Sequence, residues 1–195
     1  MKKVFRLVAV VAATVLVATT FVAPSATAAS KVKVGLAYDI GGRGDKSFND
    51  SAAAGLDRAK KKFGVTAKEV TVTQGTDSER EDKLRLLAKA GYNPIIAVGF
   101  LYAGPIKAVA SDYPNTQFAI IDDASVDLLN VAGLIFAEEQ GSYLAGVAAA
   151  LASKSGKVGY IGGVRIPLLQ KFEAGFVAGV KATNKKVTVD VKYVT

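Results

Sequence analysis

The chain has 195 residues, half of them hydrophobic, with a formal net charge of +8 and no cysteine or histidine. The missing residue types exclude disulfides, thiol catalysis, zinc centres and a Ser-His-Asp triad, and they leave acid–base chemistry to Asp, Glu, Lys or Tyr. The length suits one ordinary domain, or one domain and part of another.

Residues 1–28 have the pattern of a secretory signal peptide. A basic start is followed by an apolar segment from Leu7 to about Val22 and by the small-residue cleavage pattern Ala26-Thr27-Ala28. The small residues and the lack of basic residues after the apolar run argue against an anchoring helix. We therefore expect an exported chain, extracytoplasmic or at the cell surface, with three basic residues removed. Its charge would then be 22 − 17 = +5.

The basic residues of the remaining chain form no stripe with interleaved aromatic residues, so nucleic-acid binding is not expected. No later apolar run approaches membrane-spanning length, which predicts a soluble mature chain. It could be held at the plasma membrane through a transporter.

Short β-type runs alternate with helical patterns over the rest of the chain. In chain order, strands are expected at 32–38, 69–75, 94–100, 117–122, 131–137, 157–163 and 187–194, and helices at 48–63, 80–90, 101–111, 142–153 and 168–183. Thr76 or Asp77 can cap the second helix. The repeated β-then-α order predicts an α/β fold with a mostly parallel sheet and helices on both faces.

Ligands of such sheets bind beyond the carboxyl ends of the strands. This rule marks residues 39–49, 99–102, 122–125 and 162–167. Core packing explains the strands, but it gives no reason for the acids Asp39 and Asp122 to follow them directly.

The stretch YDIGGRGDKSFND, residues 38–50, follows the first expected strand. It fits neither a Walker loop, because Asp45 separates Gly44 from Lys46, nor the G-x-G-x-x-G fingerprint. Asp39 and Asp45 would also repel a phosphate. The tripeptide Arg43-Gly44-Asp45 spells an adhesion motif and raises a signalling or adhesion class, but three residues arise easily by chance.

The same stretch offers hydrogen-bonding groups and one aromatic ring. Asp39 can accept two hydrogen bonds, and Asn49 can both donate and accept. Phe48 could pack inward or lie flat against an aromatic ligand. Ser47 fits either an N-cap or a ligand contact. We expect Asp39 and Phe48 to face one solvent-filled gap.

The same residues and several later segments resemble a known family. DIGGRGDKSFNDSAAAGL, residues 39–56, resembles the D-x-G-G-x-x-D-x-S-F-N signature of the basic membrane protein family, the purine-nucleoside-receptor-like substrate-binding proteins of ABC importers. Residues 99–122, 136–163 and 166–182 resemble further family blocks in the same order. The resemblance covers essentially all of the chain after the signal peptide.

The resemblance implies a type I periplasmic-binding-protein fold, with a first lobe over 29–137 that is complete and a second lobe over 138–195 that is partial. It implies a monomer that is not an enzyme, needs no cofactor, and captures a purine nucleoside or similar small ligand by lobe closure. An ABC permease at the membrane is the implied partner.

The candidate ligand-binding residues lie at strand exits or at the start of the following helix: Asp39, Ser47, Phe48, Asn49, Gly99, Phe100 and Asp122. The resemblance makes Phe48 one side of an aromatic sandwich. It makes Asp39 and Asp122 acceptors for purine N–H groups. Simple core packing is an equally good account of Phe100.

Two departures from the family matter. The chain lacks the cysteine that commonly carries a lipid, and the family continues past Thr195, so the chain is either a fragment or a truncated product. Weak or no nucleoside affinity is therefore expected of the 195-residue form. The competing interpretation is an exported metal-dependent nucleoside hydrolase, with Asp39, Asp45 and Asp122 around a hard cation.

Overall fold

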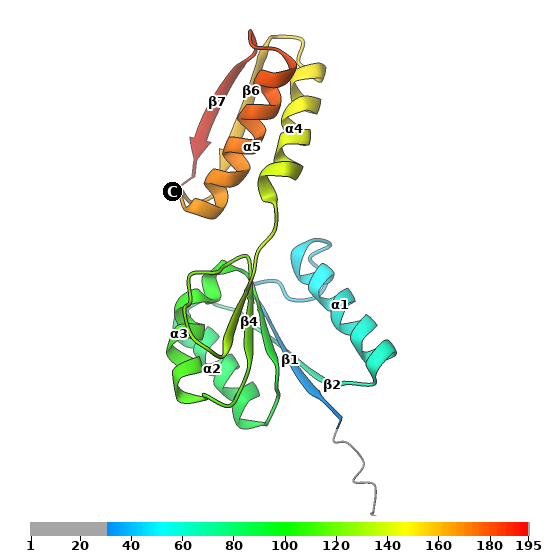
Figure 1. The fold of residues 1–195 in the computed structure, drawn as a ribbon, viewed down its shortest axis with the longest axis vertical. Helices are drawn as coiled ribbons and strands as arrows, with labels where there is room; N and C mark the ends of the chain where they lie inside the picture. The colour runs from blue at the N-terminus through cyan, green and yellow to red at the C-terminus, as the bar shows by residue number, and fades with distance from the viewer. Residues whose placement is uncertain (1–30, 195) are drawn as a thin grey trace, which may run out of the picture. The chain divides into compact units, whose positions relative to one another are not determined.

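The computed structural model describes residues 31–194 and contains two parallel sheets (Figure 1). The first sheet has the spatial order β2-β1-β3-β4-β5. Its strands are β1 (Lys33–Tyr38), β2 (Thr66–Thr71), β3 (Ile95–Val98), β4 (Phe118–Ile121) and β5 (Val131–Leu134). The second sheet pairs β6 (Lys157–Gly162) with β7 (Thr188–Tyr193). The expected α/β class with parallel pairing is confirmed, whereas the predicted signal peptide lies outside the described residues.

Five α-helices and one short 3-10 helix connect these strands. They are α1 (Phe48–Phe63), α2 (Asp77–Lys89), the 3-10 helix η1 (Phe100–Tyr102), α3 (Ala103–Asp112), α4 (Glu138–Ala152) and α5 (Pro167–Thr183). None of the helices between residues 31 and 194 is long and apolar enough to cross a lipid bilayer.

Strand β2 and helix α4 are among the elements that begin earlier than the sequence pattern predicts. Strand β2 runs from Thr66 to Thr71 because it pairs residue for residue with the whole of β1, and the expected end of this strand, residues 72–75, is a loop before α2. Helix α4 begins at Glu138, four residues before the predicted start. Acidic side chains are favoured there because the first turn of a helix carries a partial positive charge.

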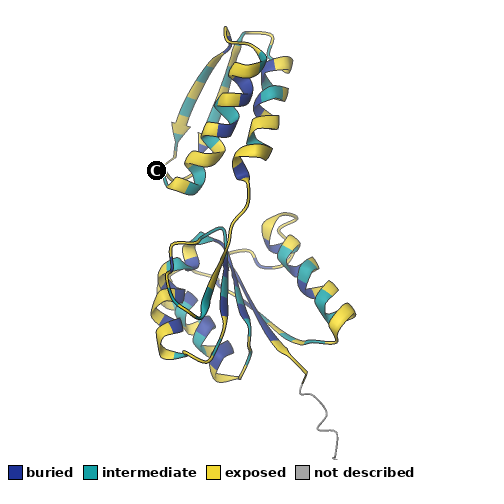
Figure 2. Cartoon of the chain, in the orientation of Figure 1, coloured by how far each residue is buried: buried dark blue, intermediate teal, exposed yellow. Residues whose placement is uncertain are grey.

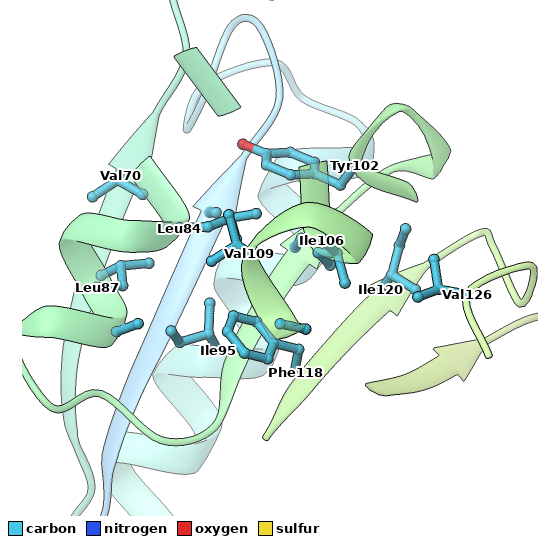
Figure 3. Packing of buried hydrophobic residues seen from close by; sticks show 14 residues of the cluster. Val70, Leu84, Leu87, Ile95, Tyr102, Ile106, Val109, Phe118, Ile120 and Val126 are labelled. Atoms are coloured by element: carbon cyan, nitrogen blue, oxygen red, sulfur yellow. The ribbon is translucent and has the colours of Figure 1, made fainter. Parts of the chain in front are cut away.

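Helices cover both faces of the first sheet (Figure 1). On one face α2 and α3 supply Leu84, Leu87, Ile106 and Val109, which pack with residues such as Phe118 (Figure 3). On the other face α1 packs through Ala53 and Leu56. Strand β1 is buried along all but its first residue, as expected for a central strand that has helices on both sides (Figure 2).

Helices α4 and α5 meet at backbone distance. A Cβ atom at Gly146 would overlap the carbonyl oxygen of Phe176, and one at Gly179 would overlap that of Tyr143. Gly175 similarly faces the carbonyl of Glu139. The absence of side chains at these glycines is therefore what lets the two helices pack so closely.

The strand order of the first sheet determines where a ligand can bind. After β1 the chain places β2 on one side, and it then places β3 on the other side of β1. The loops that leave β1 and β3 consequently diverge and open a crevice at the carboxyl ends of these strands, which is the usual ligand position in such sheets.

Exchanging one helical glycine for alanine tests the α4–α5 contact. Gly146→Ala should lower the free energy of unfolding by about 1–3 kcal/mol, because the new methyl group must push the helices apart. Gly141→Ala in the same helix is the matched control, because a Cβ there meets no atom within 4 Å. Its free energy of unfolding should be unchanged or slightly higher, since alanine has the higher helix propensity. Urea unfolding measures both, and equal effects would contradict the proposed packing.

Candidate ligand-binding site

A hollow of about 340 Å³ lies at the carboxyl ends of β1 and β3. It is lined by Asp39, Ile40, Asp45, Phe48, Asn49, Val98, Gly99, Phe100 and Asp122. Six of the seven sequence-predicted site residues share this hollow. Ser47 is the exception.

Asp39 follows β1 directly and has one engaged and one unengaged oxygen. Its Oδ1 accepts the backbone N–H of Ile40 at 2.9 Å and Nη2 of Arg80 at 2.8 Å. Its Oδ2 has no hydrogen-bond donor among residues 31–194. The sequence suggested that Asp39 can accept two hydrogen bonds from a ligand. In the structure Asp39 forms an ion pair with Arg80, and Oδ2 is the oxygen that remains available to a ligand.

Phe48 and Gly99 border the same space as Asp39. The Phe48 residue is 39 % exposed, so its ring lies outside the hydrophobic core. A Cβ at Gly99 would sit 3.7 Å from Oδ2 of Asp39 and 3.8 Å from the ring of Phe48. Gly99 has φ +110°, a conformation that favours glycine, and any larger side chain would project between acid and ring. The expectation that Asp39 and Phe48 face one gap is confirmed.

Asn49 carries an unsatisfied acceptor. The residue is 4 % exposed, and its Nδ2 donates to the carbonyl of Ile40 at 3.3 Å. Its Oδ1 is buried without a partner in the described part of the chain. A buried polar atom in this state costs free energy, so an N–H or O–H from a molecule in the hollow would be favourable there.

Asp122 is held in a strained conformation. Its φ is +68°, which is uncommon for a residue other than glycine, and such strain concentrates at functional positions. Its carboxylate accepts no hydrogen bond from the described residues. Burial, together with the charge of Glu138, raises the pKa of Asp122 above its ordinary value. A hydrogen-bond donor in the hollow would stabilise the charged carboxylate and so counteract this rise in pKa.

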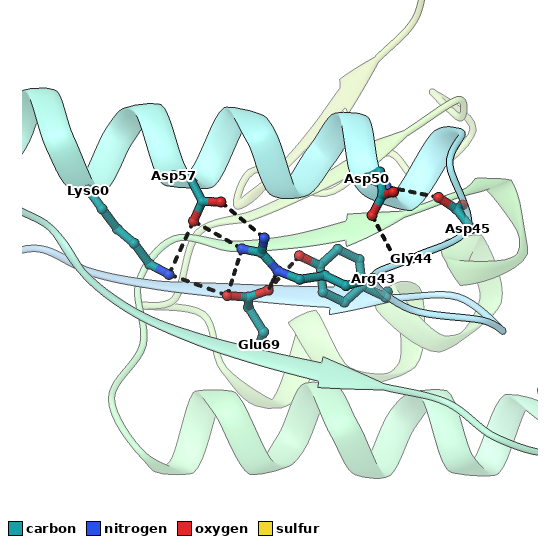
Figure 4. Close-up of polar contacts among 8 residues, drawn as sticks. Arg43, Gly44, Asp45, Asp50, Asp57, Lys60 and Glu69 are labelled. Atoms are coloured by element: carbon teal, nitrogen blue, oxygen red, sulfur yellow. Dashed lines mark hydrogen bonds and ion pairs between the residues drawn. The ribbon is translucent and has the colours of Figure 1, made fainter.

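The cap of helix α1 is Asp45 and not Ser47, which corrects the sequence-based alternative for Ser47. The Asp45 carboxylate accepts the N–H groups of Ser47, Asn49 and Asp50 at 2.8–3.1 Å, whereas the Ser47 side chain makes no capping bond. Asp50 in turn accepts the N–H of Gly44 (Figure 4) and the N–H of Lys46, both in the preceding loop. Burial alone would raise the pKa of Asp45, but the three N–H groups outweigh it and hold that pKa below its ordinary value.

Arg43 fastens the loop before α1 to the sheet (Figure 4). Its guanidinium contacts Glu69 on β2 at 2.5 Å and Asp57 on α1 at 3.0 Å. Lys60 and the hydroxyl of Tyr38 also contact Glu69. We call these five side chains the Arg43 cluster. It holds the loop that carries the site.

These contacts weaken two alternatives from the sequence. Both charged residues of the Arg43-Gly44-Asp45 tripeptide are engaged within the chain, so neither is free for an adhesion partner. The hydrolase alternative needs Asp39 and Asp45 as metal ligands. Asp39 is instead paired with Arg80, and the Asp45 carboxylate accepts the N–H groups at the start of α1. Between residues 31 and 194, no group of three acidic side chains is placed to hold a metal ion.

Sequence reasoning missed Arg80, which is 2 % exposed behind the site. A signal was present: Leu84 and Leu87 define the buried face of α2, and one step back by four residues reaches Arg80. A charged residue on a buried helical face requires a partner of opposite charge. The helical spacing of the apolar residues does not show that this partner is Asp39.

Comparison with known proteins identifies the family and the fold of the chain. Residues 31–195 match the family described as ABC transporter substrate-binding protein PnrA-like. The chain belongs to this family. Its sheet and flanking helices are those of type I periplasmic binding proteins, as a solute-binding protein of an ABC transporter system from Aeropyrum pernix shows. That structure is 34 % identical, with a TM-score of 0.72, over 84 % of this chain and 47 % of that one.

Two curated relatives extend the comparison. The CD4+ T-cell-stimulating antigen of Listeria monocytogenes is 40 % identical over 167 residues, which cover 82 % of this chain and 46 % of the antigen. The ABC transporter nucleoside-binding protein BmpA of Lactococcus lactis is 33 % identical over 168 residues, 83 % of this chain and 47 % of BmpA. The chain therefore spans about half the length of these relatives.

The cap of α1 can be tested with two neighbouring substitutions. Asp45→Ala should lower Tm by roughly 2–4 °C, because three N–H groups at the helix start lose their acceptor. Ser47→Ala should leave Tm unchanged, since that side chain caps nothing. Thermal unfolding followed by circular dichroism measures both, and a larger loss for Ser47→Ala would show that the cap is assigned to the wrong residue.

The Arg43 cluster predicts a pH-dependent contribution to stability. Arg43 lowers the pKa of Glu69 from 4.5 to about 2 against the opposing effect of burial, with help from Tyr38 and Lys60. A depressed carboxyl pKa stabilises the fold above the unfolded-state pKa, and this stabilisation is lost as the pH falls from about 4.5 towards 2. Solvent screening keeps it to about 1 kcal/mol.

Glu69→Gln should therefore cost about 1 kcal/mol at pH 7 and nearly nothing at pH 2. Urea unfolding of both proteins across this range measures the difference between them. A difference that does not change with pH would mean that the charge of Glu69 is not the stabilising feature.

Proposed function

We propose that this chain is the nucleoside-capturing part of an extracytoplasmic substrate-binding protein of an ABC importer. One observation carries the proposal: three unsatisfied acceptors lie around one hollow beside an exposed aromatic ring. The acceptors are Oδ2 of Asp39, Oδ1 of Asn49 and the carboxylate of Asp122, and the ring is that of Phe48. A planar ligand with several N–H groups matches this arrangement.

The chemistry of the hollow favours a nucleoside over a nucleotide. The base can stack on Phe48, while its N–H groups donate to the carboxylates and to the Asn49 carbonyl. Two of the three acceptors belong to acidic residues, Asp39 and Asp122. They would repel the phosphate of a nucleotide in a partly desolvated site. The nucleoside-binding name of the Lactococcus lactis relative supports this choice of ligand.

We further propose that residues 29–137 form the first lobe of a two-lobed clamp and that residues 138–195 begin the second. Closure of two such lobes on a ligand is a common hinged motion. The closed protein, a monomer, would then dock on the membrane permease of its importer. This function requires capture and release without covalent chemistry or a cofactor.

An NMR titration tests the proposal at the level of single residues. Because the chain spans about half the length of its relatives, we expect weak binding and would use millimolar inosine or guanosine. The ring signals of Phe48 and the side-chain amide of Asn49 should shift. The corresponding monophosphates should bind more weakly.

A matched pair of substitutions completes this test. Phe48→Ala should weaken nucleoside binding by about tenfold, because stacking is lost. Phe63→Ala removes an exposed ring at the other end of the same helix and should have no effect. If saturating nucleoside leaves the residues of the hollow unshifted, or if both variants bind alike, the proposal fails.

A further inference from the structure

We infer that Arg80 is a positioning residue for ligand recognition: it fixes Asp39 so that Oδ2 alone is presented to the hollow. This inference rests on the proposed function, because it names a residue that acts behind the same site. Arg80 does not line the hollow. It is buried on α2, and any effect on the ligand must pass through Asp39.

The guanidinium of Arg80 makes two strong contacts in different directions. Nη2 donates to Oδ1 of Asp39 at 2.8 Å, and Nη1 donates to the carbonyl of Gly75 at 2.6 Å. Nη1 also lies 3.4 Å from Asp77. The planar guanidinium, a rigid fork of N–H donors, therefore directs Nη2 at the Asp39 carboxylate, while Nη1 is fixed by the backbone of the loop before α2.

Tyr102 completes the support. The Arg80 guanidinium lies 5.6 Å from the centre of the Tyr102 ring. The Tyr102 hydroxyl donates to the carbonyl of Tyr38 at 2.8 Å, immediately before Asp39 in the chain. Arg80 and Tyr102 therefore fix both the side chain of Asp39 and the backbone that leads to it.

The loop that carries Gly75 is itself tightly held. The carboxylate of Glu79 accepts the N–H groups of Thr73, Gln74 and Gly75 at 2.8–3.1 Å. The hydroxyl of Thr76 accepts the N–H of Glu79 in return. The position of the Gly75 carbonyl is thus set before any ligand arrives, and Arg80 is held in place by it.

This geometry determines what Asp39 can offer a ligand. Oδ1 is engaged by Arg80 and by the N–H of Ile40, so only Oδ2 remains. A carboxylate paired with a guanidinium accepts hydrogen bonds and donates none. The Asp39 position therefore requires an N–H or O–H donor on the ligand. A lysine at position 80 could not reproduce the fork, because its ammonium is a point charge.

A double-mutant cycle on the full chain tests whether Arg80 acts through Asp39. NMR titration with inosine would compare the wild type with Arg80→Met, Asp39→Asn and the double variant. We expect each single variant to bind roughly tenfold more weakly and the double variant to bind no worse than Asp39→Asn. Fully additive losses, or wild-type affinity in a folded Arg80→Met, would overturn the inference.

Two further variants separate positioning from folding. Arg85→Met is the matched control, since Arg85 also lies on α2 and forms an ion pair, but its partner is Asp112. Its affinity for inosine should be unchanged. If Arg80→Met does not fold, Arg80→Lys decides. It should fold and bind several-fold more weakly than the wild type, and wild-type affinity in this variant would contradict the role of the fork.

A readout without ligand distinguishes failure of this inference from failure of the proposed function. The N–H of Ile40 donates to the Asp39 oxygen that Arg80 holds, so its NMR signal should move in Arg80→Lys and stay in place in Arg85→Met. If inosine does not bind the wild type but this signal behaves as expected, the ligand assignment fails and the positioning role stands. An unmoved Ile40 signal in Arg80→Lys would refute the positioning role.

Discussion

Strand β1 pairs in parallel with β2 on one side and with β3 on the other, and the candidate site depends on this double pairing. From β1 the chain continues to β2 on one side and then to β3 on the other side of β1. The loops at the carboxyl ends of β1 and β3 therefore separate. Asp39 directly follows β1 and Gly99 directly follows β3, and the two residues lie next to each other across the opening. The buried β1, packed between α1 on one face and α2 and α3 on the other, gives this edge a rigid base.

Several features of the site carry a free-energy cost. Asn49 buries an unpaired oxygen, Asp122 has a positive φ, and a buried Arg80 compensates the charge of Asp39. Each of these features opposes folding when it is considered alone. They are tolerated together because a packed sheet and two capped helix starts fix the surroundings. A ligand with N–H donors would recover part of the cost.

Most residues that line the hollow could be predicted from the sequence, but the residues that hold them in place, Asp45 and Arg80, could not. Asp39 and Asp122 were recognisable because acids directly after buried strands have no packing role. The Ser47 cap was open to error, since Asp45 and Ser47 both precede α1, and only the loop conformation decides which carboxylate or hydroxyl reaches the free N–H groups. Arg80 lay 41 residues from Asp39. Periodicity places a residue on a helical face without identifying what the face touches.

The glycine contacts between α4 and α5 also limit how this part of the protein can evolve. At Gly146, Gly175 and Gly179 the facing atom is a main-chain carbonyl, which cannot rotate away as a side chain would. Compensation by a second substitution is therefore unavailable at these positions, because no neighbouring residue can be shortened to make room. Sequence drift in the two helices should be confined to their outer surfaces, while the seam between them keeps its smallest residues.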